Sequence, residues 1–257
     1  MGGTLKVAII SDLHSNREAL EAVFADIRRR GVTDLVCLGD VIGYGPDPEF
    51  CVDLVRGHAR WCLMGNHDEA LFRDASDFNP HARGAIEYTR TRMQPSWYSS
   101  AETKARWKYL KALPLRVQEN GMLFVHGSPR DPVREYVLST DGILNPNKLR
   151  AIFDSFEGVG VAGHTHQPGL HYEDLRFQAL EGAAELCLPL EPSKRYFVNV
   201  GSTGQPRDGD LRACYAVLEE HQVTWYRVEY DFRLTQDKIL GTGVLSEILA
   251  RRLAVGK

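Results

Sequence analysis

Apolar runs near the start of the chain alternate with segments of helical spacing. Residues 5–11 form an apolar run with β-branched side chains, as in a strand that is buried on both faces. Residues 17–30 then carry apolar side chains at helical intervals, and Ser15 with Glu18 predicts a capping box at the start of this helix. This order is typical of a β-α unit with its helix outside a sheet.

The later elements fall into two groups. The β-α pattern continues with strands at 35–38, 61–64, 122–125 and 159–162 and with helices at 49–56 and 146–156. After Gly163, turn residues and short apolar runs predict antiparallel strands at 170–175, 196–200, 214–219 and 224–228. We expect the second group to build a further sheet packed on the first, and a last helix at 245–253.

The segment 69–115 is the longest stretch between two groups of candidate functional residues, and its spacing is helical. We interpret it as a helical insertion beside the site. The chain has 257 residues, of which 43% are hydrophobic, which is enough to bury one large core. We therefore expect residues 1–257 to form a single domain.

Polar residues able to bind metal follow directly after five of the predicted strands. They are Asp12 and His14, Asp40, Asn66, His126, and His164 with His166. The carboxyl ends of such strands meet at one edge of a sheet, so we expect these side chains to converge. In extended chain, residues two apart point the same way, which would pair Asp12 with His14 and His164 with His166.

Carboxylates and imidazoles without thiolates suit borderline divalent ions. We expect two such ions, with manganese as first choice and iron, zinc, nickel or cobalt as alternatives. Asp40 is the candidate bridge between them, and a hydroxide shared by both ions would attack phosphorus in line. His67 is the candidate general acid for the leaving oxygen, with Asp68 holding its ring.

Three further residues lie close in sequence to these donors and are candidates for substrate contact: Asn16, Tyr44 and Arg130. The loop 201–209 could lend backbone N–H groups to an anion. Trp97, Tyr98, Trp107 and Tyr109 fit either a lid over a nucleobase or, with more weight, core packing of the insertion. No G-x-G-x-x-G follows the first strand, which disfavours a dinucleotide-binding domain.

Charge and cysteine content limit the partners. The net charge is -3 and no basic stripe is present, so duplex nucleic acid is not an expected partner. No run reaches the roughly 18 apolar residues of a membrane span. The five cysteines include no C-x-x-C pair, which favours a reduced protein, and we expect a cytoplasmic location. Homo-oligomer formation is left open.

Five short blocks together resemble the calcineurin-like metallophosphoesterase superfamily. They are S-D-L-H at 11–14, G-D at 39–40, G-N-H-D at 65–68, V-H-G at 125–127 and G-H-T-H at 163–166. Within that superfamily the chain looks most like the small bacterial and archaeal phosphodiesterases of the YfcE and MJ0936 type. The resemblance implies a four-layer α/β/β/α sandwich of two mixed sheets, with helices on the outer faces.

The resemblance also implies how the donors are shared. One ion would take Asp12, His14, Asp40 and His166, and the other would take Asp40, Asn66, His126 and His164. His67 matches the catalytic histidine of the superfamily. The expected function is hydrolysis of a phosphate ester, with nucleotides among the candidate substrates. A phosphodiesterase is the first expectation, and a phosphomonoesterase acting on protein or nucleotide is the second. The non-enzymatic alternative is a metal-poor interaction scaffold.

Overall fold

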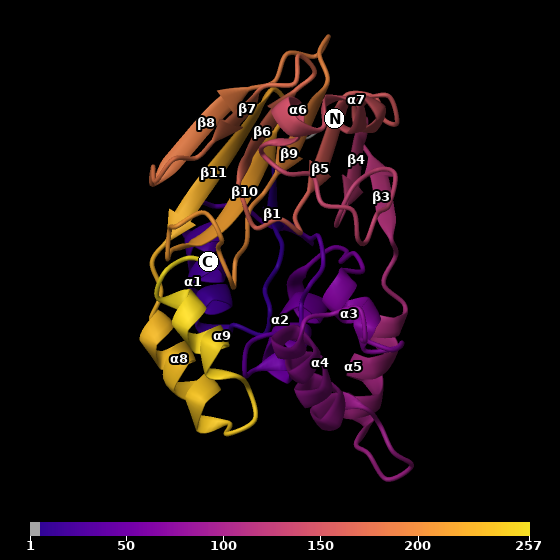
Figure 1. The fold of residues 1–257 in the computed structure, drawn as a ribbon, viewed down its shortest axis with the longest axis vertical. Helices are drawn as coiled ribbons and strands as arrows, with labels where there is room; N and C mark the ends of the chain where they lie inside the picture. The colour runs from indigo at the N-terminus through magenta and orange to yellow at the C-terminus, as the bar shows by residue number, and fades with distance from the viewer. Residues whose placement is uncertain (1–5) are drawn as a thin grey trace.

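The strands form two mixed sheets that pack face to face, with helices on both outer faces (Figure 1). This computed structural model describes residues 6–257, so the predicted strand residue Leu5 lies outside it. The first sheet has the order β2-β1-β10-β11-β8. Its strands are β1 (Lys6–Ile10), β2 (Asp34–Cys37), β8 (Glu185–Pro189), β10 (Ala213–Glu219) and β11 (Gln222–Val228). Among the described strands of this sheet, β1 and β2 are parallel and the other neighbours are antiparallel.

The second sheet has six strands in the order β3-β4-β5-β9-β6-β7. They are β3 (Arg116–Glu119), β4 (Met122–Val125), β5 (Val159–Ala162), β6 (Gly169–Tyr172), β7 (Phe177–Ala179) and β9 (Tyr196–Asn199). The three central strands β4, β5 and β9 are parallel, and the outer ones are antiparallel. The four-layer α/β/β/α sandwich expected from the sequence is confirmed.

The predicted division of strands between the sheets is wrong. The strands β4 and β5 continue the β-α pattern but lie in the second sheet, whereas the late hairpin β10–β11 joins the first sheet beside β1. The segment 61–64 is not a strand, because it contributes only an isolated bridge between Cys37 and Cys62. The apolar pattern marks which residues are buried, but it does not say which strand pairs with which.

Alternate residues of the strands build separate layers of the core. In β1, Val7 and Ile9 face the space between the sheets, and Ala8 and Ile10 face the outer helices. Trp225 is fully buried between the sheets, and its indole N–H donates to the carbonyl of Asn199 at 2.8 Å. Both faces of the central strands are therefore buried, as their continuous apolar runs predicted.

Helices cover the two outer faces. The first sheet is covered by α1 (Arg17–Arg29) and α2 (Pro48–His58), and the second by α6 (Asp141–Leu144) and α7 (Pro146–Phe153). The predicted cap of α1 is off by one residue. Asn16, not Ser15, is the N-cap, and its side chain accepts a hydrogen bond from the backbone N–H of Ala19 at 3.1 Å.

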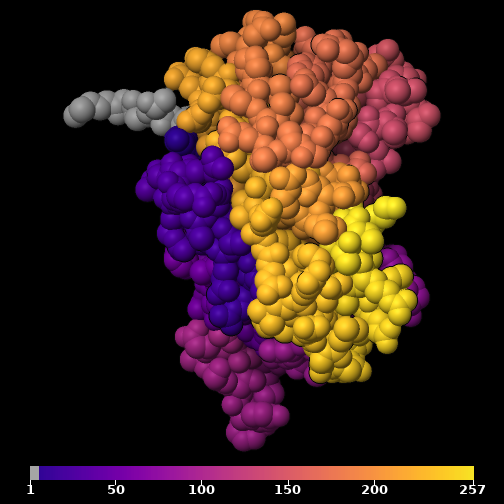
Figure 2. Space-filling view, turned by 90° about the vertical axis from the view of Figure 1, so that its left-hand side faces the viewer, coloured from indigo at the N-terminus to yellow at the C-terminus, as the bar shows by residue number. Residues whose placement is uncertain are grey.

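Two helical groups extend beyond the sheets at the lower end of the molecule (Figure 1). One holds α3 (Asn66–Ala70), α4 (Pro80–Met93) and α5 (Ala101–Lys111), and the other holds α8 (Phe232–Gly241) and α9 (Glu247–Leu253). Figure 2 shows the C-terminal group in yellow beside α1 in indigo, consistent with the packing of α8 on α1. None of the helices within residues 6–257 is long and apolar enough to cross a membrane.

Candidate metal centre

The site lies in loops that leave the strands of both sheets at one end. Asp12 and His14 follow β1, Asp40 follows β2, His126 follows β4, and His164 with His166 lies between β5 and β6. Asn66 and His67 begin α3. The convergence of these residues, predicted from their positions after strands, is present.

Five of these residues have a left-handed backbone. They are Asp12 (φ 54°), His14 (φ 49°), Asp40 (φ 51°), His164 (φ 64°) and His166 (φ 60°). The expectation that each pair would lie in extended chain is therefore wrong, because the chain turns at each donor. Residues with side chains rarely adopt this conformation, and such strained positions cluster at functional sites.

Glycines let two of the loops approach very closely. A Cβ on Gly65 would lie 2.1 Å from Oδ1 of Asp40, and a Cβ on Gly163 would lie 2.5 Å from Oδ2 of Asp12. A methyl group at either position would displace a carboxylate.

The close approach at Gly65 gives a testable prediction. Gly65→Ala is expected to lower the free energy of unfolding by about 1–3 kcal/mol and to weaken metal binding, because the methyl group overlaps Asp40. Denaturant unfolding and metal analysis would measure both effects. Gly84→Ala in α4 is the matched control, since nothing lies within 4 Å of its Cβ and alanine favours a helix. Equal behaviour of the two variants would contradict the prediction.

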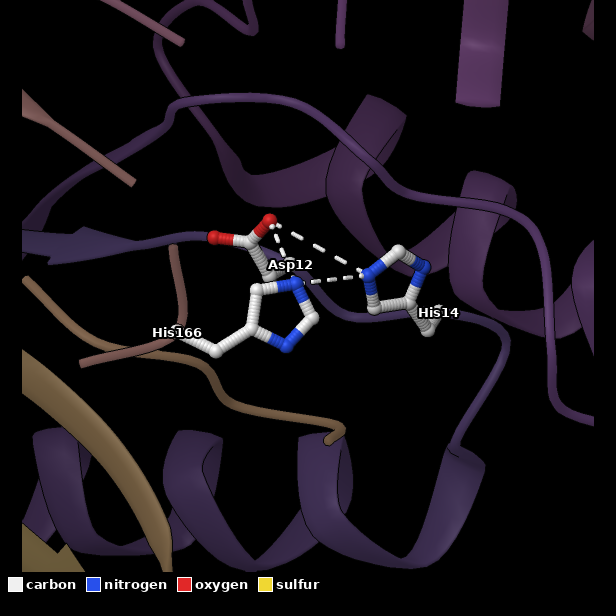
Figure 3. Close-up of side chains that lie close together, drawn as sticks. All are labelled: Asp12, His14 and His166. Atoms are coloured by element: carbon white, nitrogen blue, oxygen red, sulfur yellow. Dashed lines mark hydrogen bonds and ion pairs between the residues drawn. The ribbon is translucent and has the colours of Figure 1, made fainter. Parts of the chain in front are cut away.

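One cluster of donors is formed by Asp12, His14 and His166 (Figure 3). The Nε2 atoms of His14 and His166 lie 3.2 Å apart. Oδ1 of Asp12 lies 3.2 Å from Nε2 of His166 and 3.9 Å from Nε2 of His14. Oδ2 of Asp12 accepts the backbone N–H of His164 at 3.0 Å, so one carboxylate oxygen is held and the other faces the imidazoles.

A second cluster is formed by Asp40, His126 and His164. Nε2 of His126 lies 3.1 Å from Nδ1 of His164 and 3.2 Å from Oδ1 of Asn66. Oδ1 of Asp40 accepts the backbone N–H of His67 at 2.8 Å. Its Oδ2 lies 3.5 Å from Nε2 of His126 and 3.7 Å from Nε2 of His14, so Asp40 stands between the two clusters.

The opposite nitrogen of each imidazole bonds to a backbone carbonyl. The pairs are His14 with Ile42 (3.2 Å), His126 with Leu38 (3.0 Å), His164 with Arg134 (3.1 Å) and His166 with Gln205 (2.5 Å). A carbonyl only accepts, so this nitrogen carries the proton, and in a neutral ring the nitrogen in the cluster then has a free lone pair. Two lone pairs that face each other cannot form a hydrogen bond, but they can share a cation.

The pKa values reflect burial and the two carboxylates. Burial lowers the pKa of His14 and His166, and lowers that of His164 to about 3. Burial also opposes charge on His126, but the carboxylates of Asp40, Asp12 and Asp68 together outweigh it and raise the pKa of His126 to about 9. Burial would raise the pKa of Asp40, yet His126 and His67 hold it well below its ordinary value. Without cations, His126 therefore takes a proton that a bound cation would displace.

His67 and Asp68 have different positions relative to the two clusters. His67 has a ring nitrogen close to His14 and Asp40, and burial lowers its pKa to about 4. Its Nδ1 faces Gly43 and has no hydrogen-bond partner among the described residues. The prediction that Asp68 holds this ring is wrong: its carboxylate accepts the backbone N–H groups of Val41, Ile42 and Gly65. Asp68 therefore fixes the loops around Asp40.

A cavity of about 250 Å³ opens beside the two clusters. Its walls include Asp40, Asn66, His67, His164 and His166, together with Tyr44, Arg73, Asp77, Phe78, Asn79, Arg134, Tyr136 and Arg207. Tyr136 stacks on His164 with ring centroids 3.8 Å apart. Among the three predicted substrate contacts, Tyr44 lies at this cavity.

The other two predicted contacts do not reach the cavity. The side chain of Asn16 caps α1 and donates to the carbonyl of Gly204 at 2.8 Å, so its hydrogen bonds are used inside the fold. Arg130 is exposed and pairs with Glu135 at 3.1 Å. Arg134 and Arg207, which the sequence did not single out, lie at the cavity instead. Closeness in sequence to a metal donor therefore selected Arg130, which lies at the surface, and did not identify the two arginines at the cavity.

The segment 69–115 is helical and contributes Arg73, Asp77, Phe78 and Asn79 to the cavity wall. The four aromatic residues considered for a lid do not line the cavity. Trp97 and Tyr98 are 89% and 76% exposed at the turn between α4 and α5, which projects from the molecule in Figure 1, whereas Trp107 and Tyr109 pack against the core.

Comparison with known proteins decides the family. The model of the calcineurin-like phosphoesterase superfamily domain matches residues 5–222. The chain belongs to this superfamily. The resemblance expected from the five blocks is thereby confirmed, and with it a phosphoesterase fold that carries a cluster of aspartate and histidine residues able to hold metal.

Relatives of this superfamily member cover its whole length. The uncharacterized protein MJ0912 of Methanocaldococcus jannaschii is 35% identical over 98% of both chains. The crystal structure of a metallophosphoesterase from Sphaerobacter thermophilus is 38% identical, covers 99% of this chain and 100% of its own, and has a TM-score of 0.83. The hypothetical protein PH1004 of Pyrococcus horikoshii, 18% identical over 98% of this chain and 99% of its own, shares the fold with a TM-score of 0.75.

Proposed function

We propose that this chain hydrolyses phosphate esters at a centre of two divalent cations, with phosphodiesters as the leading substrate class. The observation that carries the proposal is the arrangement of the four histidines. Each has one ring nitrogen bonded to a backbone carbonyl and the other directed at a neighbouring imidazole or carboxylate. Membership of the phosphoesterase superfamily supports the same chemistry.

The donor set fits two cations. One would be held by Asp12, His14, Asp40 and His166, and the other by Asp40, Asn66, His126 and His164. Donors that share an ion at about 2.1 Å lie roughly 3.0–3.4 Å from one another, and the close donor pairs here are 3.1–3.2 Å apart. Asp40 is the proposed bridge, because Oδ2 lies within 3.7 Å of a histidine from each cluster. Oxygen and nitrogen donors without sulfur suit manganese, iron, zinc, nickel or cobalt.

Two such cations would polarise the phosphate oxygens and lower the pKa of a bound water. The residues of the chain would orient the metal ligands and donate the proton to the leaving group. Asp12 and Asp40 keep one oxygen each on a backbone N–H, which fixes the direction of the other. His67, between Tyr44 and Phe78 at the cavity wall, is the proposed proton donor to the leaving oxygen. An anionic phosphate beside a buried imidazole raises its pKa, which favours protonation in the complex.

A phosphomonoesterase using the same donors is the second candidate, favoured by the positive charge of Arg207 at the cavity. A metal-poor scaffold is disfavoured because the donors of both clusters are buried, in position and bonded to backbone groups.

Metal removal and reconstitution test the proposal. Chelation is expected to abolish turnover, and manganese, nickel or zinc to restore it, with bis-p-nitrophenyl phosphate compared against p-nitrophenyl phosphate. The metal content of the purified and reconstituted protein is measured in parallel. Fewer than about one ion per chain, with no turnover of either ester after reconstitution, would establish the scaffold instead.

A further inference from the structure

Three arginines line the cavity, and two of them are neutralised. Nε of Arg73 lies 3.1 Å from Glu69, and its Nη1 lies 2.8 Å from Asp77. Nη2 of Arg134 also bonds to Glu69, which therefore joins the insertion to the loop that follows β4. Their charges are balanced by carboxylates before any substrate arrives.

Arg207 has neutral partners only. Its Nη2 donates to Oε1 of Gln205 at 2.9 Å and to the hydroxyl of Tyr44 at 3.3 Å. It is half-buried at the cavity and forms no ion pair with any residue in the range 6–257. The guanidinium groups of Arg207 and Arg252 lie 5.7 and 5.8 Å from the centre of the Tyr44 ring, but Arg252 does not line the cavity and its Nε donates to the main-chain oxygen of Lys257 at 2.7 Å. Among the three cavity arginines, Arg207 is therefore the one whose guanidinium pairs with no carboxylate of residues 6–257.

The guanidinium of Arg207 is fixed relative to the histidine clusters. The backbone N–H of Arg207 donates to the carbonyl of His166 at 3.3 Å, and the carbonyl of Gln205 accepts from Nδ1 of the same histidine. The ring of Tyr44, which binds Arg207, lies 4.5 Å from that of His67. Little conformational freedom is left to lose when a ligand binds, which favours recognition of a group at a set position.

We propose that Arg207 binds a second negative charge of the substrate and so makes the site select dianionic phosphate esters over singly charged diesters. A guanidinium forms paired hydrogen bonds with phosphate oxygens, and these bonds are among the strongest in proteins. The second charge is either the third free oxygen of a terminal phosphate or a second phosphate in the substituent of a diester. This inference rests on the proposed phosphoesterase function and narrows its substrate class.

Three substrates with wild type and three variants test the proposal. p-Nitrophenyl phosphate is a dianionic monoester, UDP-glucose is a pyrophosphate diester with two charges, and bis-p-nitrophenyl phosphate is a singly charged diester. Arg207→Gln is expected to lower kcat/KM by about 10- to 100-fold for one or both dianionic esters and by less than about 3-fold for the singly charged one. Arg207→Lys is expected to recover part of the loss, and Arg130→Gln is the surface control.

The binding of inorganic phosphate to the metal-loaded protein, measured by calorimetry, gives a readout that does not need turnover. Arg207→Gln is expected to weaken it about 10-fold at unchanged metal content. A loss confined to p-nitrophenyl phosphate assigns the second charge to a terminal phosphate, and a loss confined to UDP-glucose assigns it to a neighbouring phosphate. Two outcomes would overturn the proposal. One is an equal loss of kcat/KM by Arg207→Gln on all three esters, and the other is no loss on any ester together with unchanged phosphate binding.

If the wild-type protein hydrolyses none of the three esters, the proposed phosphoesterase function is rejected, but the role of Arg207 in binding an anion is still open to test. The phosphate-binding comparison then decides the role of Arg207. Weaker binding by Arg207→Gln would support an anion site, and equal binding would reject it.

Discussion

Replacing His67 with alanine is expected to lower kcat by about 10²- to 10⁴-fold while the metal content stays unchanged. The imidazole lies at the cavity wall beside both clusters, and its removal takes away the proposed proton donor but leaves the carbonyl-bound histidines in place. The loss is expected to be larger for phenyl esters than for p-nitrophenyl esters, because the poorer leaving group depends more on the proton. Steady-state kinetics with both esters measures the difference.

The control for this variant is His221→Ala, a change at an exposed histidine whose side chain lies outside the cavity. It is expected to leave both rates and metal content unaltered. If His67→Ala loses metal, His67 is a ligand and not a proton donor. An equal loss for both leaving groups would point to phosphate binding by this histidine.

Asp40→Asn is expected to reduce kcat/KM at least about 10³-fold and to deplete both cations. The amide keeps the shape of the side chain, and its oxygen can still accept from the backbone of His67, so the fold is retained. The charge of Oδ2 between His14 and His126 is lost. Metal analysis together with circular dichroism separates loss of cations from unfolding.

Asp12→Asn provides the comparison that tests bridging. Asp12 offers a ligand atom to one cluster only, and an amide oxygen can still accept the backbone N–H of His164, so this variant is expected to deplete one cation and to retain part of the other. Asp174→Asn, on an exposed turn, is the neutral control. If Asp40→Asn and Asp12→Asn deplete the metals to the same extent, Asp40 does not hold both ions.

The convergence of the donors was predictable from the sequence because residue type and position after a strand carry the information. Asp12, Asp40 and His126 each follow an apolar run, and such runs end at one side of a packed sheet. The helical nature of 69–115 was readable for a similar reason, since helical spacing is local. The assignment of strands to sheets could not be predicted from the sequence, because the pairing of β1 with β10 joins residues some 200 positions apart.

Three features of the site have no signature in the sequence. The left-handed backbone at Asp12 and His166 occurs in residues for which that conformation is uncommon. The carbonyl groups that orient the histidines belong to Ile42, Leu38, Arg134 and Gln205, and any residue type could provide them.

The third feature is which arginine of the loop after β4 lies at the cavity. Arg130 lies nearer His126 in sequence, but Ser128 closes a tight turn by accepting its N–H, and the side chain goes to the surface. Arg134 follows the turn back to the cavity. The path of the loop, and not the residue type, therefore decides which of these two arginines reaches the cavity.

The centre spans the junction of the two sheets, since Asp12, His14 and Asp40 leave the first sheet and His126, His164 and His166 leave the second. Donors from the two ends of this set, such as His14 and His166, are 152 positions apart along the chain. Each proposed cation takes donors from both sheets, so a chain with only one sheet formed would present an incomplete donor set for either ion. We therefore expect the affinity for cations to depend on the packing of one sheet against the other, so that metal binding and folding of the whole domain are coupled.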